Sequence, residues 1–234
     1  MSQKKILMVL TSHDRLGNTD EKTGFWLEEF ASPYYVFKDS GLHITLCSPK
    51  GGQPPLDPKS ALPDYQTEAT HRFQDDEVAR THLAQTLRLV EVKASDYDAV
   101  FFPGGHGPLW DLTCDPDSVS LIDDFYAQSK PIGAVCHASG VLINAVGNSD
   151  EDEPYPMIKG KRVTGFSDSE ESAVGLIEVV PYLVEEELVN RGGIYCKGDD
   201  WAPHIEVDGL LVTGQNPASS QQAAQAIVEL LNKE

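Results

Sequence analysis

The chain has 234 residues, of which 40% are hydrophobic and 24% are charged. This composition is typical of a globular domain rather than a disordered segment, and the length suits one large domain with a full core. The formal net charge is −19. A surface this acidic repels phosphate backbones and anionic lipid, so we expect neither nucleic-acid binding nor membrane binding.

Cysteine content and the terminal sequence bear on the cellular compartment. Four cysteines are too few for a disulfide scaffold in a chain this long, and no two have the close spacing of a zinc site. The first residues lead into an apolar stretch without the pattern of a signal peptide. No apolar run reaches the length of a membrane span. We therefore expect a cytoplasmic protein with reduced thiols.

Apolar runs alternate with amphipathic segments along the chain. The runs predict buried strands at 6–11, 43–48, 99–102, 131–135 and 210–213, and shorter strands at 162–164 and 193–196. Helical spacing predicts helices over 25–37, 77–89, 118–128, 170–177, 182–190 and 219–231, and one directly after Cys136. The Pro- and Gly-rich residues 49–63 predict a long loop, of the kind that often lines sites.

This alternation predicts an α/β fold, a three-layer sandwich whose mostly parallel central sheet is covered by helices on both faces. We expect a single domain over residues 1–234, with loop insertions around 49–75 and 148–160. Ligands of such sheets bind at the carboxyl ends of the strands. Three distinctive segments fall at such ends, namely 11–13, 103–107 and 136–137, and we expect them to converge on one site.

Cys136 follows a buried run and precedes small residues and Gly140. This pattern predicts a sharp strand-to-helix turn that presents one side chain, as in the nucleophile elbow of hydrolases. The N–H groups and dipole at the start of the helix favour the thiolate, so Cys136 is predicted to be an activated nucleophile. The other cysteines fit inert packing: Cys47, Cys114 and Cys196.

Two features around Cys136 suggest supporting chemistry. His137 is either a base or orienting group for the sulfur, or a polar cap on the helix, and spacing alone does not decide between them. The turn formed by Gly104, Gly105, His106 and Gly107 permits close approach of a substrate to the backbone. N–H groups from this turn and from His137 can form an oxyanion hole.

Two pairs of acidic residues are further candidates. Glu28 interrupts an apolar face that begins with Phe25-Trp-Leu27, and a buried carboxyl there would have a raised pKa and hold a proton at neutral pH. The alternative for Glu28 and its neighbour Glu29, which spacing alone favours, is one carboxylate at the edge of the core and one in solvent. Glu170 and Glu171 open a predicted helix and complement its dipole. Either Glu170 or Glu171 is also a candidate to orient His137.

Four segments together resemble the ThiJ/PfpI superfamily, and in particular its branch of glyoxalase III enzymes and holding chaperones. They are Pro103-Gly-Gly-His-Gly107, Ala134-Val-Cys-His137, Thr164-Gly-Phe-Ser-Asp168 with the acidic pair that follows, and Val212-Thr-Gly-Gln-Asn-Pro-Ala-Ser219. Lys22-Thr-Gly24 and Asp57-Pro-Lys-Ser60 also look like this branch. The resemblance implies a flavodoxin-like fold similar to that of class I glutamine amidotransferases.

The resemblance also implies roles, carried over by position. It makes Cys136 the nucleophile, Glu28 the buried carboxyl beside it, His137 the adjacent histidine and Glu171 its acidic partner, with Gly104, Gly105 and His106 as the oxyanion and substrate-binding group. The implied reaction is the glutathione-independent, cofactor-free conversion of methylglyoxal, a small 2-oxoaldehyde, to lactate, or a related deglycase reaction. The base is Glu28 or His137. A homodimer and a holding-chaperone function are implied as well.

Other functions fit the sequence less well. A glutamine amidotransferase places a His-x-Glu pair after its last strand, where this chain has 214–219 without such a pair, while His204-Ile-Glu206 precedes that strand. A cysteine protease needs an open cleft, and a non-enzymatic stress chaperone needs exposed apolar surface. His71 and His82 stand eleven residues apart, which is no strong ligand pattern, so no metal is predicted.

Overall fold

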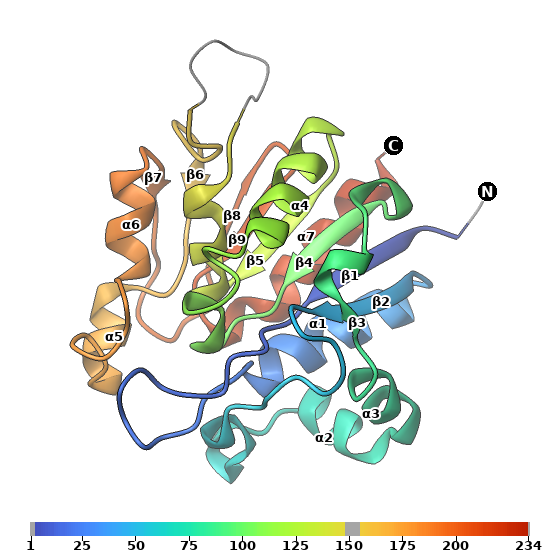
Figure 1. Cartoon of the computed structure of the whole chain (residues 1–234), viewed down its shortest axis with the longest axis horizontal. Coiled ribbons are helices and arrows are strands. Elements are labelled where there is room, and N and C mark those ends of the chain that lie inside the picture. The colour runs from blue at the N-terminus through green and yellow to red at the C-terminus, as the bar shows by residue number, and fades with distance from the viewer. Residues whose placement is uncertain (1–2, 148–154, 234) are drawn as a thin grey trace.

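The computed structural model describes residues 3–147 and 155–233. Its centre is a seven-stranded sheet in the order β3-β2-β1-β4-β5-β9-β8 (Figure 1). All neighbours are parallel except β8 and β9, which are antiparallel. The strands of this sheet are β1 (Lys5–Val9), β2 (His43–Ser48), β3 (Leu87–Arg88), β4 (Ala99–Phe102), β5 (Ile132–Val135), β8 (Ile205–Asp208) and β9 (Leu211–Gly214).

Helices cover both faces of this sheet. Figure 1 shows α1 (Leu27–Asp39) and α7 (Ser220–Asn232) on one face and α4 (Pro116–Ala127) on the other. The remaining helices are α2 (Glu68–Asp75), α3 (Glu77–Leu83), α5 (Asp168–Val174) and α6 (Val184–Asn190), and β6 (Arg162–Val163) pairs with β7 (Ile194–Tyr195) in a small second sheet. Short 3₁₀ helices are η1 (Pro58–Ala61), η2 (Pro63–Tyr65), η3 (Leu89–Glu91), η4 (Ala94–Asp96), η5 (Gly107–Leu109), η6 (Cys136–Asn144) and η7 (Pro217–Ser219).

The central strands are apolar on both faces because each face has its own core. Along β1, Ile6 and Met8 pack with α1 and α7, whereas Leu7 and Val9 belong to the core beneath α4. The two-residue alternation of a strand sends successive side chains to opposite faces. The predicted three-layer α/β fold with its mostly parallel sheet is confirmed.

Some predicted elements were wrong in extent. The helix predicted over 77–89 ends at Leu83, because Leu87–Arg88 pairs as β3 with the end of β2. Strand β8 was not predicted; its alternating exposure gives a weaker signal than a fully apolar run. Helix α2 lies within the insertion expected at 49–75. Part of the other expected insertion, 148–154, lies outside the described residues.

The main sheet takes strands from residue 5 through residue 214, which supports the proposal of a single domain. Among residues 3–147 and 155–233, none of the helices combines the length and the apolar character needed to cross a bilayer.

Candidate active site

Cys136 lies at the junction of β5 and η6, at the carboxyl end of a central strand. Its φ angle is +59°, in the left-handed region that costs a residue other than glycine roughly 1–2 kcal/mol. Its side chain is 3% exposed. Backbone strain of this kind is concentrated at functional sites, and here it turns the thiol out of the strand direction.

The glycine turn after β4 lies against this elbow. A Cβ at Gly104 would stand 3.1 Å from the Cys136 Cβ and 2.5 Å from the carbonyl oxygen of Val135. Gly105 has a φ of +96°, and a Cβ there would meet the carbonyl oxygen of Gly24 at 2.4 Å. Both positions therefore require glycine so that two strand ends and the start of α1 can meet.

A histidine and a carboxylate extend from the thiol. The Cys136 Sγ lies 3.2 Å from His137 Nδ1, and His137 Nε2 lies 2.7 Å from Glu171 Oε2. Glu171 stands in the first turn of α5, whose start is capped by the Ser167 hydroxyl. The three side chains form a Cys–His–Glu chain of the geometry used to activate nucleophiles.

His106 binds the same carboxylate from the other side. Its Nε2 lies 2.9 Å from Glu171 Oε1, and its ring lies against that of His137 with centroids 3.8 Å apart. Among the described residues, His106, His137 and Glu171 are the group whose geometry could hold a metal ion, because their ligand atoms lie within 4.8 Å of one another. In this structure the Nε2 atoms of His106 and His137 both bond the Glu171 carboxylate.

Burial and mutual charge determine the protonation of His137 and Glu171. Burial lowers the pKa of His137, the charge of His106 lowers it further, and the Glu171 carboxylate opposes both. Burial alone would raise the pKa of Glu171, but the charges and hydrogen bonds of the two histidines outweigh burial and lower it. Both shifts favour an ionised Glu171 beside a His137 that gives up its proton more readily than an ordinary imidazole. With Nε2–H donated to Glu171, the Nδ1 atom is free to accept the thiol proton.

The buried carboxyl beside the thiol is Glu29, and the prediction that it is Glu28 was wrong. Glu29 is fully buried, and a Cβ at Gly104 would come within 2.3 Å of its Oε2. Its polar neighbours are the Cys136 thiol and the Gly104 amide, though neither contact has the geometry of an ordinary hydrogen bond. Burial raises the pKa of Glu29 to about 8, so this group holds a proton at neutral pH.

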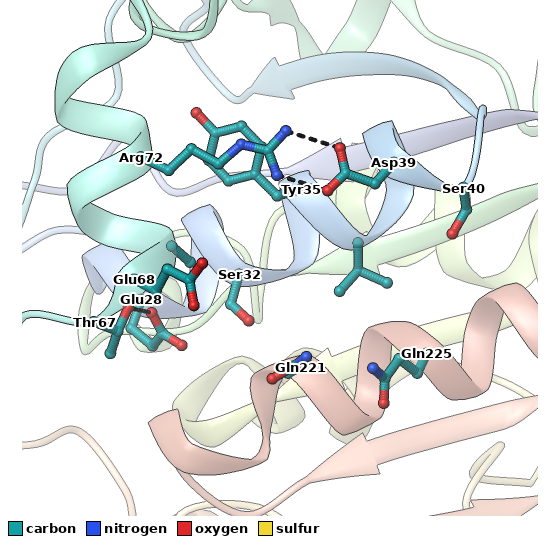
Figure 2. Close-up of a pocket in the computed structure, with 12 residues that line it drawn as sticks. Glu28, Ser32, Tyr35, Asp39, Ser40, Thr67, Glu68, Arg72, Gln221 and Gln225 are labelled. Atoms are coloured by element: carbon teal, nitrogen blue, oxygen red, sulfur yellow. Dashed lines mark hydrogen bonds and ion pairs between the residues drawn. The ribbon is translucent and has the colours of Figure 1, made fainter.

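Glu28 points to a different part of the molecule. Its carboxylate accepts a hydrogen bond from the Thr67 hydroxyl and lines a polar pocket between α1, α2 and α7 (Figure 2). Figure 2 shows the Arg72–Asp39 ion pair on another wall of this pocket. The pocket does not include Cys136 among its lining residues.

Helical spacing explains the difference. Glu29 shares a face of α1 with Pro33 and Phe37, four and eight residues on, and all three are buried. The N–H of Trp26 donates to the carbonyl oxygen of Gly104 at 3.0 Å, which fixes the start of α1 beside the glycine turn. The spacing of these buried residues was the sequence signal that could have identified Glu29.

The pKa of the Cys136 thiol lies well above its ordinary value. Burial is the largest cause, and the charge of an ionised Glu29 and its polar contact with the thiol add to it, whereas the His137 backbone N–H acts in the opposite direction. The helix-start argument from sequence predicted a lowered pKa and was wrong for the resting site. Because Glu29 is protonated below about pH 8, its charge is absent there, and burial remains the main cause of the raised pKa of the thiol.

Glu170 has a separate structural role. Its Oε1 accepts hydrogen bonds from the Trp201 backbone N–H and the Asn216 side chain, both at 2.8 Å. Its Oε2 accepts from Ser167. Of the two acidic residues considered for His137, Glu171 is therefore the one in contact with it.

The thiol opens into a cavity of about 710 Å³. Four aromatic side chains stand among its lining residues, and none of residues 49–63, the loop predicted from the sequence, does so; Asp64 and Tyr65 follow directly after that loop. The lining residues are Trp26, Glu29, Asp64, Tyr65, Gly105, His106, Cys136, His137, Phe166, Ala173, Val174, Trp201, Asn216, Pro217 and Ala218. Residues 11–13 do not line it: Thr11 instead bonds Asp111, and His13 stacks on Trp110.

The remaining candidates from the sequence do not join this site. His204 Nε2 bonds Glu206 at 3.1 Å, and Glu206 also binds Arg162 through two nitrogens. This His-x-Glu pair thus stabilises the edge of the sheet, and the histidine that contacts the thiol is His137. His71 and His82 belong to α2 and α3 and do not form a metal-ligand group within the described ranges.

Fold and site together define an α/β protein with a buried cysteine at a strand–helix elbow, a histidine–glutamate pair and a protonated carboxyl. The chain belongs to the DJ-1/PfpI family, whose sequence pattern matches residues 22–230. This confirms the resemblance found in the sequence.

Three relatives align over nearly their full lengths. The chain is 30% identical to the glutathione-independent glyoxalase HSP31 of Saccharomyces cerevisiae over 240 residues, covering 99% of each. The crystal structure of glyoxalase III from Candida albicans matches with a TM-score of 0.86 and 27% identity, covering 97% of each chain. The rapid encystment protein of Francisella tularensis matches with a TM-score of 0.90 and 38% identity, over 98% of this chain and 99% of that one.

Proposed function

We propose that this protein is a glutathione-independent glyoxalase that converts methylglyoxal to lactate. One observation carries the proposal: a buried carboxyl whose pKa is raised to about 8, Glu29, lies against the buried thiol of Cys136. An internal shift of hydrogen from one carbon to its neighbour needs a nucleophile and a group that takes up and returns a proton at neutral pH. The names of the yeast and Candida relatives support the same activity.

The reaction begins with addition of the sulfur to the aldehyde. Cys136 Sγ bonds to the aldehyde carbon, the thiol proton passes to His137 Nδ1, and the aldehyde oxygen takes the proton of Glu29, which gives a hemithioacetal and leaves Glu29 ionised. Backbone N–H groups of Gly105 and His137 stabilise the oxygen as its negative charge develops. Glu171 holds His137 in the tautomer that leaves Nδ1 free to accept.

The second stage moves hydrogen between the two carbons. Ionised Glu29 removes the proton from the carbon bonded to sulfur, His137 gives the proton that it took from the thiol to the neighbouring carbonyl oxygen, and an enediol forms. Glu29 returns that proton to the neighbouring carbon, while the hydroxyl on the carbon bonded to sulfur gives its proton to His137, and a lactoyl thioester is left on Cys136. Water then cleaves the carbon–sulfur bond, releases lactate and restores the thiol. One carbon is oxidised and its neighbour reduced, so no external oxidant or reductant is consumed.

The test is a substrate panel run without glutathione: methylglyoxal, glutamine and a casein peptide. We expect methylglyoxal consumption by the wild type and none above the uncatalysed rate with Cys136→Ala, whose folding is checked by circular dichroism. Ammonia release from glutamine, or cleavage of the peptide, faster than methylglyoxal loss would instead support the amidase or protease alternative.

Three further expectations belong to this proposal. A cytoplasmic location accords with four free cysteines, one of which, Cys114, is exposed, because such thiols persist in reducing compartments.

A homodimer is tested by light scattering coupled to size-exclusion chromatography. A holding-chaperone activity is tested by suppression of client aggregation, in which Cys136→Ala should equal the wild type if the two functions are separate.

A further inference from the structure

The cavity in front of Cys136 is far larger than methylglyoxal requires. Its volume of about 710 Å³ lies in the range of roughly 300–1,000 Å³ that holds drug-sized ligands. A water molecule takes up about 30 Å³ of liquid volume, and methylglyoxal has the bulk of only a few waters. Most of the space beyond the reacting carbons is thus available to a larger substituent.

Two aromatic pairs form walls of this space. Trp26 and Tyr65 meet edge to face with centroids 5.0 Å apart, and Phe166 and Trp201 meet in the same way at 5.8 Å. The first pair comes from the start of α1 and from η2, and the second from segments on either side of α5 and α6. Aromatic rings prefer such edge-to-face and offset contacts, so a flat apolar group bound between them gains directional packing as well as burial.

The walls of the cavity offer no cationic side chain to an anionic substrate. The cavity is lined by Asp64 and by Glu29, which holds a proton at neutral pH, and no Lys or Arg is among its lining residues. A carboxylate on the substrate would lose its hydration without gaining a cationic partner. The substituent that suits this space is therefore aromatic and uncharged.

Trp201 is held at the cavity wall by its backbone. Its φ is +65°, a conformation that is an outlier for a bulky residue, and its N–H donates to Glu170 Oε1. The same oxygen accepts from the Asn216 side chain, and Asn216 also lines the cavity. Although 48% of Trp201 is exposed, buried polar contacts thus fix the position from which its ring faces Phe166.

We propose that the preferred substrates are 2-oxoaldehydes carrying an uncharged aromatic substituent, and that Trp201 determines this preference. The inference rests on the proposed glyoxalase function and extends it to the class of substrate. Cys136 attacks the aldehyde carbon as before, and the aryl group on the neighbouring carbonyl lies against the aromatic walls.

The experiment compares kcat/KM for phenylglyoxal, 4-carboxyphenylglyoxal and methylglyoxal. For the wild type we expect phenylglyoxal to exceed methylglyoxal by about 10-fold or more, since even a single methylene in an apolar pocket is worth about 10-fold or more. The carboxylated analogue should fall below phenylglyoxal by a similar factor. Equal values for phenylglyoxal and methylglyoxal, or a preference for the anionic analogue, would overturn the inference.

Variants assign the preference to Trp201. Trp201→Ala should reduce the ratio of phenylglyoxal to methylglyoxal kcat/KM by about 10-fold, and Trp201→Phe should restore much of it. Trp110→Ala is the matched control, because Trp110 stacks on His13 outside this cavity, and it should leave the ratio unchanged. A ratio unaffected by Trp201→Ala would remove Trp201 from the account. If neither aldehyde is turned over by the wild type, the proposed function itself fails.

Discussion

Glu28 and Glu29 are neighbours in sequence, but their surroundings give them opposite importance for the reaction. We predict that Glu29→Gln lowers kcat/KM for methylglyoxal about 100-fold or more, the scale of general acid–base catalysis, because glutamine cannot accept and return a proton. Glu28→Gln is the matched control and should stay within about twofold, since Glu28 bonds Thr67 away from the thiol. Equal losses in the two variants would contradict the assignment.

The raised pKa of Glu29 also predicts how stability depends on pH. Between its usual value of 4.5 and about 8, the unfolded chain releases this proton while the folded protein keeps it. The free energy of unfolding therefore falls as pH rises through that window, by at most a few kcal/mol. Glu29→Gln should reduce the fall in Tm from pH 5 to pH 8, whereas exposed Glu186→Gln should not. A decline as steep in Glu29→Gln as in the wild type would refute the shifted pKa.

Residue patterns in the sequence located the thiol but not its carboxyl neighbour. The apolar run ending at Cys136 predicted the elbow because a strand and a turn leave local signals. The identity of the buried acid depends on which face of α1 meets the sheet. The family resemblance assigned this role to Glu28, one residue before the buried Glu29. The contact between His106 and Glu171 joins segments 65 residues apart, and such long-range contacts leave no local pattern.

At the scale of elements, the elbow between β5 and η6 stores backbone strain. Cys136 has a φ of +59°, which glycine adopts freely and alanine does not. We predict that Cys136→Gly is more stable than Cys136→Ala by about 1 kcal/mol, after the greater entropy of unfolded glycine is subtracted. Urea unfolding of both variants measures the difference. A glycine variant less stable than the alanine variant would show that the elbow is unstrained.

The elements that the sequence predicted best are those whose burial is uniform. Strands β1, β4 and β5 are buried along nearly their whole length and appear as unbroken apolar runs. Strand β8 exposes the apolar Val207 and buries the charged Glu206, so hydropathy does not predict a strand there. Its place is determined by the antiparallel ladder with β9, a tertiary contact that hydropathy does not encode.

For the molecule as a whole, charge opposes folding. The chain carries 37 acidic and 18 basic residues, and the Debye length falls from about 30 Å at 0.01 M salt to about 8 Å at 0.15 M. We predict that this increase in salt raises Tm by roughly 2–4 °C, corresponding to about 1 kcal/mol. NaCl and KCl should act equally, because screening does not depend on the ion's identity. A Tm that falls with salt would mean that attractive ion pairs dominate.

The central claim is that Cys136 and its neighbours convert a 2-oxoaldehyde rather than merely trap it. The most direct measurement is proton NMR of methylglyoxal incubated with the protein in glutathione-free buffer, following aldehyde loss and lactate gain together. The account predicts one lactate for each methylglyoxal lost over many turnovers, and no lactate from Cys136→Ala. Aldehyde loss that stops at one equivalent per thiol without lactate, or lactate formed by Cys136→Ala, would contradict it.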